Sequence, residues 1–453
     1  MSSLPRPLPR SLDALCHVAK SFSVEALAEG PVADLVREAL VSAGTRPQRH
    51  SPLQPLFMCW FLLCRSLFPS DSLEALFARL AGALRGRIPG LDLRAVTDSA
   101  LCHARDRLGI APFAHLLRRL TEDAPESSRF QGLHVRALDG VRMDVPDTKA
   151  NRDAFGRPRC ASGDSSWPQV LVMVLFDIAL RLPLDARVVP CHTAEKVVGR
   201  DVLDCLGEQD LLLLDTGFYG IPFLSTVADT GARFLCPVPR HVRFRRCGQK
   251  RRYGGVLEYR ASMHARLQLP GGRTRVAWME VRVIEVDSPG RSTRRYVTNL
   301  PETIPASDIA LVYPERWKEE MAFDEIKTVL CHGPAGAAPT PLRSKSPDAV
   351  ALEVFALLCA HAIIRRTMSL AAARAGTSPG NLSFTNSLRL ITQAALTMLG
   401  APAHRLTHLY EELLRDIAAQ TLRRPPRPRQ CPRQVRRKGP RYSIKKPLPA
   451  VAA

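Results

Sequence analysis

Residues 210–220 read DLLLLDTGFYG. A short, wholly apolar run of this kind is typical of a strand that is buried on both faces in the middle of a sheet. The run ends at Asp215, and burying an acid at the carboxyl end of a central strand is costly unless the acid binds something. Asp215 is therefore either a ligand-binding residue or a plain cap of the strand, and the run alone leaves both interpretations open.

Three strand-like segments and a helix precede this run. The strands are expected at 133–145 (LHVRALDGVRMDV), 169–180 (QVLVMVLFDIAL) and 184–190 (LDARVVP), and the helix at Thr193–Leu206. Three strands, a helix and a central strand follow one another in the order of the RNase H fold, so we expect an α/β, RNase H-like core within residues 131–422. Asp139 closes the first strand in RALDG, although Asp-Gly is also a common hairpin turn.

A β-rich insertion is expected at about residues 237–300, between the central strand and the last helices. In VAWMEVRVIEV (276–286), alternate residues fall on opposite faces, as in a half-buried strand. The segment RHVRFRRCGQKRR (240–252) holds seven Lys or Arg and no acid. It either lies along a nucleic-acid backbone or forms a solvated loop.

The net charge of +21, from 64 Lys and Arg against 43 Asp and Glu, indicates an acidic partner, first of all nucleic acid. Eleven cations and no carboxylate lie between Arg423 and Lys446. We therefore expect residues 423–453 to form a basic, disordered tail that contacts phosphates. Residues 347–422, before the tail, are expected to be C-terminal helices.

Residues 1–130 are expected to form a helical N-terminal DNA-binding domain. Within it, TDSALCHARDRLG (97–109) predicts a helix capped by Thr97 or Asp98, following an amphipathic helix capped by Ser70 or Asp71. Arg105 and Arg107 on the later helix are candidates for DNA contact. An ordinary helical hairpin with a solvated basic face fits the same residues.

Cysteine usage and apolar stretches bear on the cellular setting. The twelve cysteines include no C-x-x-C pair, so neither a zinc ribbon nor a disulfide scaffold is indicated. The apolar stretches at 56–64 and 349–364 are too short or carry polar residues, and the N-terminal residues lack the apolar core of a signal peptide. We expect a cytoplasmic protein with no membrane partner.

The segment YPERWKEEMAFDEIK (313–327) carries the pattern Y-x2-R-x3-E-x6-K in Tyr313, Arg316, Glu320 and Lys327. In an α-helix, which turns about 100° per residue, these four residues share one stripe about 60° wide. Glu319 falls about 60° to the other side of Arg316, so the helical wheel selects Glu320 as the acid of the stripe. A surface helix with i,i+4 ion pairs is the alternative interpretation.

Three carboxylates placed by one fold suit phosphodiester cleavage. Carboxylates are oxygen ligands that Mg²⁺ prefers, and a pair of Mg²⁺ ions supplies both a nucleophilic water and a stabilised leaving oxygen. We therefore expect Asp139, Asp215 and Glu320 to bind two Mg²⁺ ions, for which Mn²⁺ substitutes.

The chain resembles a known family, the bacterial insertion-sequence transposases with a DDE triad, called the insertion-sequence-four family. LDGVRMDVPDTKANRDAFG (138–156), LLLLDTGFYG (211–220) and YPERWKEEMAFDEIKT (313–328) are similar to its three acid-containing blocks. LRSKSP (342–347), PRQVRRKGPRYSIKKP (432–447) and TDSALCHARDRLG also look like family sequence.

The resemblance implies cut-and-paste transposition of an insertion sequence by DNA strand cleavage, a DNA hairpin and strand transfer. It also implies metal ligation by Asp139, Asp215 and Glu320, and positioning of the DNA strand by Tyr313, Arg316 and Lys327. The implied partners are double-stranded DNA, as terminal inverted repeats and target, and a second subunit in a homodimeric synapse within the bacterial nucleoid. Trp278 is a weak candidate for stacking on a flipped base and a better one for strand packing.

Two alternatives remain at this point. One is a catalytically inactive, transposase-derived DNA-binding protein, which would tolerate loss of an acid. The other is a stand-alone RNase H-like nuclease, which would need neither the basic tail nor a second DNA end.

Overall fold

The computed structural model describes residues 32–46, 53–84, 96–122, 129–160, 163–164, 167–268, 274–287, 293–330, 342–401 and 403–422. The predicted basic tail lies outside these ranges. The chain divides into a compact unit of residues 1–421 and a second unit of residues 422–453. All helices and strands that the structure describes belong to the first unit.

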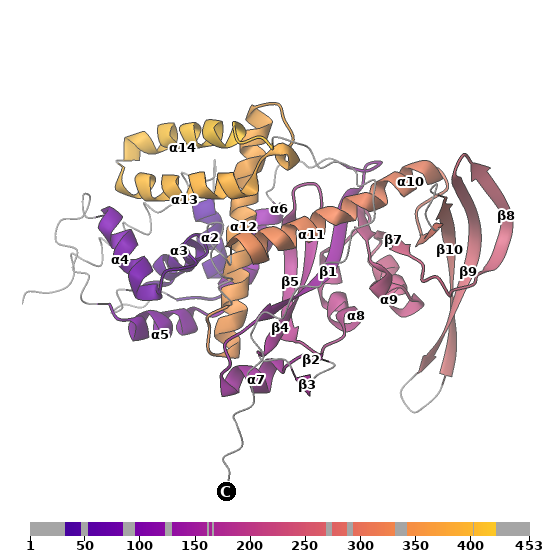
Figure 1. Ribbon diagram of the computed structural model, residues 1–453, viewed down its shortest axis with the longest axis horizontal. Coiled ribbons are helices and arrows are strands. Elements are labelled where there is room, and N and C mark those ends of the chain that lie inside the picture. The colour runs from indigo at the N-terminus through magenta and orange to yellow at the C-terminus, as the bar shows by residue number, and fades with distance from the viewer. Residues whose placement is uncertain are drawn as a thin grey trace, which may run out of the picture. The chain divides into compact units, whose positions relative to one another are not determined.

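A nine-stranded sheet in the order β5-β4-β1-β6-β7-β11-β10-β9-β8 forms the centre of this unit (Figure 1). Its first five strands are β1 (His134–Asp144), β4 (Gln169–Asp177), β5 (Leu182–Pro190), β6 (Asp210–Leu213) and β7 (Arg233–Pro237). β4 is antiparallel to both β1 and β5, whereas β6 and β7 continue the sheet in parallel to β1. This arrangement confirms the predicted RNase H-like core.

Position 139 differs from the prediction. Asp139 lies in the middle of β1, opposite Val174 of β4, so Asp-Gly is neither the end of this strand nor a hairpin turn. The short strands β2 (Arg159–Cys160) and β3 (Gly163–Asp164) form a separate ribbon after helix α7 (Lys149–Phe155).

The apolar run at 211–214 is explained by helices on both faces of the sheet. Leu211 and Leu213 belong to one buried cluster, and Leu212 and Leu214 belong to the other. The first cluster includes helices α6 (Ala111–Glu122), α11 (Trp317–Asp324) and α12 (Pro347–Arg374). The second includes α8 (Glu195–Val198), η3 (Gly199–Cys205) and α9 (Ile221–Asp229). The helix expected at 193–206 is thus one short α-helical turn followed by a 3-10 helix.

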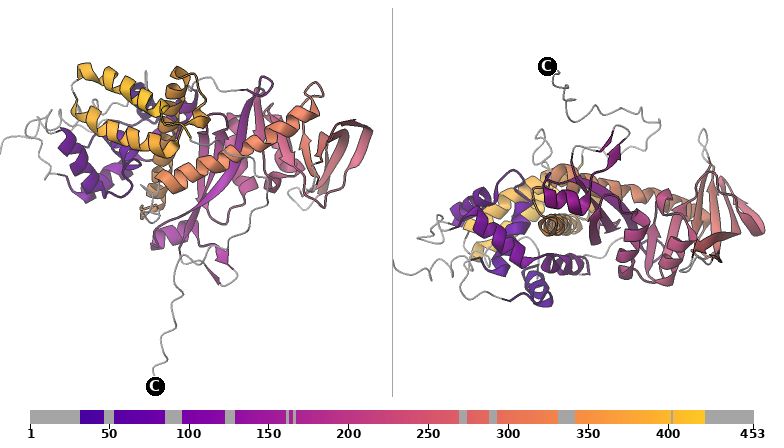
Figure 2. Two further views of the ribbon diagram at one scale, coloured as in Figure 1. Left: turned by 45° about the horizontal axis from the view of Figure 1, so that its top comes forward. Right: turned by 90° about the horizontal axis from the view of Figure 1, so that it is seen from below.

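The N-terminal and C-terminal helices gather around α12 (Figure 2). They are α2 (Val32–Ser42), α3 (Pro55–Arg65), α4 (Leu73–Leu84), α5 (Asp98–Leu108), α13 (Phe384–Gly400) and α14 (Ala403–Ala418). Thr97 caps α5 as predicted, since its side chain accepts a hydrogen bond from the Ala100 amide. For α4 the predicted cap is wrong, because Ser72 accepts from the Ala75 amide at 3.0 Å in place of Ser70 or Asp71.

Helix α12 is the one described helix that by length and composition alone could cross a membrane. Within its most apolar window, 78% is buried inside the protein, as in the core helix of a folded domain. Its apolar character is therefore accounted for by the helices and strands that surround it.

The β-rich insertion is present and extends the core sheet. Its strands are β8 (Arg245–Tyr253), β9 (Val256–Gln268), β10 (Thr274–Val286) and β11 (Arg294–Thr298), and β11 pairs antiparallel with β7. Trp278 of β10 lies opposite His264 of β9, their ring centroids are 5.3 Å apart, and the indole is 59% exposed. It forms a cross-strand pair on an outward face.

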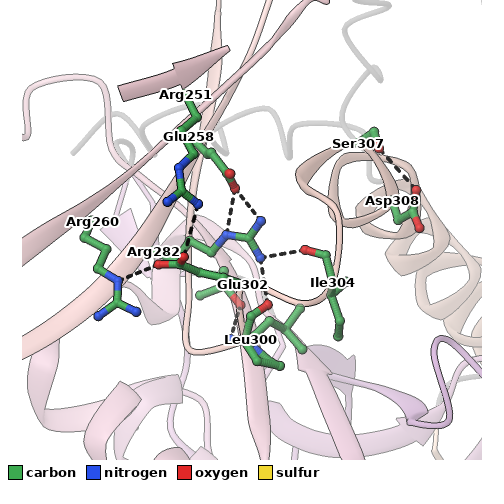
Figure 3. Close-up of polar contacts among 11 residues, drawn as sticks. Arg251, Glu258, Arg260, Arg282, Leu300, Glu302, Ile304, Ser307 and Asp308 are labelled. Atoms are coloured by element: carbon green, nitrogen blue, oxygen red, sulfur yellow. Dashed lines mark hydrogen bonds and ion pairs between the residues drawn. The ribbon is translucent and has the colours of Figure 1, made fainter. Parts of the chain in front are cut away.

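Polar contacts join the insertion to the segment that leads toward the third acidic block (Figure 3). The guanidinium of Arg282 pairs with Glu258 and donates hydrogen bonds to the carbonyls of Pro301 (2.9 Å) and Ile304 (2.8 Å). Glu302 accepts from Arg260 at 2.6 Å. These contacts fix the start of α10 (Ala306–Val312) against the edge of β9 and β10.

Candidate active site where the central strands end

Asp139 and Asp215 become neighbours through the parallel pairing of β1 with β6. The register ends at Ala137 opposite Leu213, each two residues before an aspartate, and Asp139 and Asp215 lie close enough for the charge of Asp215 to raise the pKa of Asp139. The carboxylate of Asp139 accepts a hydrogen bond from the Gly140 amide at 2.8 Å. Gly217 makes room for Asp215, because a Cβ at position 217 would lie 2.9 Å from Oδ1 of Asp215.

The surroundings of Asp139 disfavour its ionised form. Burial raises its pKa to about 6 against the favourable effects of the Gly140 amide and Arg316, and the negative charges of Asp215 and Glu195 add to the increase. A bound cation would offset the burial and the repulsion that penalise the ionised form of this carboxyl group. An isolated surface carboxylate has no such penalty to offset.

The third acidic block changes helix type twice. Tyr313–Arg316 is a 3-10 helix (η5), Trp317–Asp324 is the α-helix α11, and Glu325–Leu330 is a π-helix (η6). Because these helices turn by different angles per residue, the uniform wheel used to compare Glu319 with Glu320 does not hold across the segment.

Both ends of the block are tied to the strands that carry the aspartates. The hydroxyl of Tyr313 donates to the carbonyl of Leu214, directly before Asp215, at 3.1 Å. The ammonium of Lys327 donates to the carbonyl of Arg142 on β1 at 3.0 Å. The segment lies across the sheet between the insertion and α12 in Figures 1 and 2.

Arg316 is at the centre of the acids. It donates to Oε1 of Glu320 at 3.0 Å and to Oε2 of Glu319 at 3.4 Å, and it lies 3.9 Å from Oδ2 of Asp139. The side chain of Glu320 is 37% exposed. This one cation therefore connects the first and third acidic blocks.

Glu319 does not point away from the site, as the wheel predicted. Its side chain is fully buried, and burial raises its pKa well above the ordinary value, with a further increase from the charges of Asp139 and Asp215 that Arg316 opposes. Glu319 is therefore the buried acid of the pair and lies near the aspartates, whereas Glu320 is partly exposed and is linked to Asp139 through Arg316.

The donor set fits a hard divalent cation. The buried Oδ1 of Asp215 and Oε1 of Glu319 have no hydrogen-bond partner among the described residues. Such unpaired carboxylate oxygens are costly to bury and are the ligands that Mg²⁺ and Mn²⁺ prefer. In the described ranges, three or more Asp, Glu, His or Cys side chains are nowhere already arranged around one point to hold a metal. Among the described acids, Glu320 has its carboxylate paired with Arg316.

The other predicted residues lie elsewhere, and one acid was missed. Arg105 turns back to pair with Asp106 at 2.9 Å, and Arg107 faces solvent on the same helix. Glu195, at the start of α8, was not singled out in the sequence, where it is simply an acid in the first turn of an expected helix. The charge of Glu195 raises the pKa of Asp139. The pKa of Glu195 is itself raised, mainly by burial and also by the charge of Asp215, so Glu195 belongs to the same cluster.

Known proteins match this chain over most of its length. A family model described as "Transposase DDE domain" matches residues 131–363, and one described as "Insertion element 4 transposase N-terminal" matches residues 21–118. "Transposase InsG for insertion sequence element IS4" of Escherichia coli (strain K12) is 26% identical over 420 residues, covering 90% of this chain and 91% of that protein. "Putative transposase InsZ" of the same organism is 25% identical over 151 residues, covering 32% of this chain and 50% of that protein.

Among solved structures, a piggyBac transposase synaptic complex with hairpin DNA aligns over 93% of this chain and 87% of that chain. The TM-score is 0.41 and the sequence identity is 11%, a degree of likeness that supports no conclusion about function.

Proposed function

The chain belongs to the insertion-sequence-four family of DDE transposases, and from this premise we propose that Asp139, Asp215 and Glu320 are its catalytic metal ligands. A DDE transposase cleaves DNA and transfers the cut strand with the help of divalent metal ions. The adjacency of Asp139 and Asp215 on parallel strands, with Arg316 joining Asp139 to Glu320, is the observation that supports the residue assignment.

The proposed cofactor is Mg²⁺, bound as two ions, with Mn²⁺ as a substitute. When bound, such a pair supplies charge for the attacking and the leaving oxygen of a phosphodiester displacement. The oxygen-only donors and the unpaired Oδ1 of Asp215 support this choice.

The remaining residues of the signature position these groups and the DNA. Tyr313 orients the end of β6 through the Leu214 carbonyl, and Lys327 holds the π-helix near β1. Arg316 neutralises the acids before DNA is present and is then available to a phosphate, for which its forked guanidinium is suited.

The proposed substrate is the double-stranded DNA of an insertion sequence, with its terminal inverted repeats and a target duplex. Two subunits are proposed to form a homodimeric synapse on two ends, in the nucleoid of the bacterial cytoplasm. Residues 1–130, with Arg105 and Arg107, are proposed to select the DNA end, and the net charge of +21 supports phosphate contact throughout.

The assignment is tested by cleavage of an end-bearing duplex in Mg²⁺ with purified Asp139→Asn, Asp215→Asn and Glu320→Gln proteins. Because the three acids act as one unit, each single variant should lose cleavage about as completely as the triple variant. DNA binding, followed by gel shift, should persist since cations hold the phosphates.

Glu319→Gln is the matched control, since its side chain is fully buried and burial raises its pKa, which disfavours the charged form. An uncharged isostere should therefore preserve folding and most of the cleavage. If Glu320→Gln still cleaved DNA and Glu319→Gln did not, Glu319 would replace Glu320 as the third proposed metal ligand.

A further inference from the structure

The carboxylate of Glu195 reaches the backbone of β1 beside Asp139. A Cβ placed on Gly140 would lie 3.3 Å from Oε1 of Glu195 and 3.0 Å from Cδ1 of Leu171. The amide of the same Gly140 donates to Oδ1 of Asp139. Gly140 therefore contacts the carboxylate of Asp139 through its amide and leaves room for the carboxylate of Glu195 where a side chain would otherwise lie.

The two carboxylates approach from opposite faces of the sheet. Successive side chains of a strand point to opposite faces. Ala137, two residues before Asp139, is in the cluster that contains α11, whereas Leu138, two before Gly140, is in the cluster that contains α8. Glu195 thus approaches β1 from the face of the sheet opposite the third acidic block.

Helix α8 is also attached to the loop that begins with Asp215. The ammonium of Lys196, next to Glu195, donates to the carbonyl of Tyr219 at 2.7 Å. A Cβ on Gly199 at the end of α8 would lie 3.2 Å from the ring of Phe218, so backbone and loop are in close contact there. These contacts hold Glu195 at a set position relative to both aspartates.

Glu195 accepts no hydrogen bond from the residues that the structure describes, although it is half-buried and lies near the cation Arg142. Its simplest role would be that of a first-turn acid that stabilises α8. That role is weak in a helix of four residues, and it does not explain a carboxylate directed at the one glycine beside Asp139. The unpaired Oδ1 of Asp215 in the same corner indicates a ligand with positive charge.

We propose that Glu195 is a fourth carboxylate of the divalent-cation site, reaching it past Gly140, whose missing side chain leaves room for the Glu195 carboxylate on that face of β1. This inference rests on the proposed function of Asp139 and Asp215. The ligand class is a hard divalent cation, Mg²⁺ or Mn²⁺, which accepts additional oxygen ligands directly or through water.

The test is the affinity of the full-length, DNA-free protein for Mn²⁺, measured from the electron paramagnetic resonance signal of free Mn²⁺. Glu195→Gln should weaken binding about tenfold, the lower end of the effect of residues that support metal ligands. The matched control is Asp201→Asn in η3, an exposed acid whose removal changes the net charge equally and should leave the affinity unchanged. Asp139→Asn should weaken binding more than Glu195→Gln.

A second variant separates the position of Glu195 from its charge. Gly140→Ala keeps all acids but adds a methyl group 3.3 Å from Oε1, so it should also weaken Mn²⁺ binding. In the Glu195→Gln background the same methyl group should have little further effect. Unfolding midpoints of all variants show whether the fold is retained.

The outcomes distinguish the two levels of the proposal. Wild-type affinity in Glu195→Gln, with the expected loss in Asp139→Asn, overturns the role of Glu195 alone. Wild-type affinity in Asp139→Asn overturns the proposed site and, with it, the fourth ligand.

Discussion

Ionisation of Asp139 lowers the free energy of unfolding because of where this residue lies. Its pKa is about 6, above the ordinary value of 3.8, because burial and the neighbouring acids penalise its charge. The folded protein therefore holds a proton more tightly than the unfolded chain between these two pH values. The contribution to stability is present below pH 3.8 and is lost as the pH rises through about 6.

Asp139→Asn should remove this cost. In EDTA, the variant should gain unfolding free energy relative to the wild type as the pH is raised from 4 to 8, by on the order of 2 kcal/mol. Urea unfolding at the two pH values measures the difference, and a gain of the same size at both would mean that the charge of Asp139 is not the cause.

The sequence predicted the surroundings of Asp215 better than those of Asp139 and Glu319. Asp215 comes directly after a wholly apolar strand, and such a strand is expected where both faces of a sheet are covered. Leu213 packs into the cluster on one face of the sheet and Leu212 into the cluster on the other. The position of Glu319 could not be predicted, because a change from 3-10 to α to π helix is not visible in side-chain periodicity. Glu320 as the third ligand stays a prediction that depends on the signature spacing.

Glu195 was missed for a different reason. Its proximity to Asp139 depends on Gly140 and on the way α8 folds over β1, which are tertiary contacts between residues 55 positions apart. A single sequence gives no signal for such a contact.

At the scale of elements, the π-helix is held by a buried ion network. Glu325 accepts hydrogen bonds from Arg181 (2.9 Å) and from Nε of Arg365 (2.8 Å), and it lies 3.0 Å from Nε2 of His361. Burial alone would raise the pKa of Glu325, but Arg365, His361 and Arg181 outweigh it and hold the pKa at about 2. The network fixes the rotation of the helix that carries Glu320.

Glu325→Gln should lower the free energy of unfolding by about 3–5 kcal/mol, because it leaves buried arginines without their anion. Asp324→Asn, one residue earlier and exposed, should change it by less than about 0.5 kcal/mol. Urea unfolding compares the two. Arg365→Met should cost less in the Glu325→Gln background than in the wild type, and strictly additive losses would contradict a shared network.

At the scale of the whole molecule, one sheet continues from the catalytic core into the insertion. Ladder hydrogen bonds between β7 and β11, together with Arg282 and its partners, join the two parts. The strand pattern predicted β-strands at about residues 237–300, where β8 to β11 lie. It could not predict the attachment, because pairing between distant strands is not encoded in the periodicity of either.

The tail expected at 423–453 lies outside the described residues, so its role stays a prediction from its eleven cations. Deleting it should flatten the dependence of DNA affinity on salt by roughly 0.9 in the logarithmic slope for each phosphate that the tail neutralises. Preference for a terminal-repeat duplex should survive, since residues 1–130 are proposed to provide it. Isotherms at several salt concentrations, with specific and random duplexes, measure both, and an unchanged slope would contradict the tail's role.

The network around Glu325 also has a consequence in time. Arg181 precedes Glu325 by 144 residues, while Arg365 follows it by 40. A ribosome adds about 5–20 residues per second, so the last partner is synthesised roughly 2–8 s after Glu325 itself. A growing chain therefore carries both aspartates well before Arg365 is available to anchor the third acidic block.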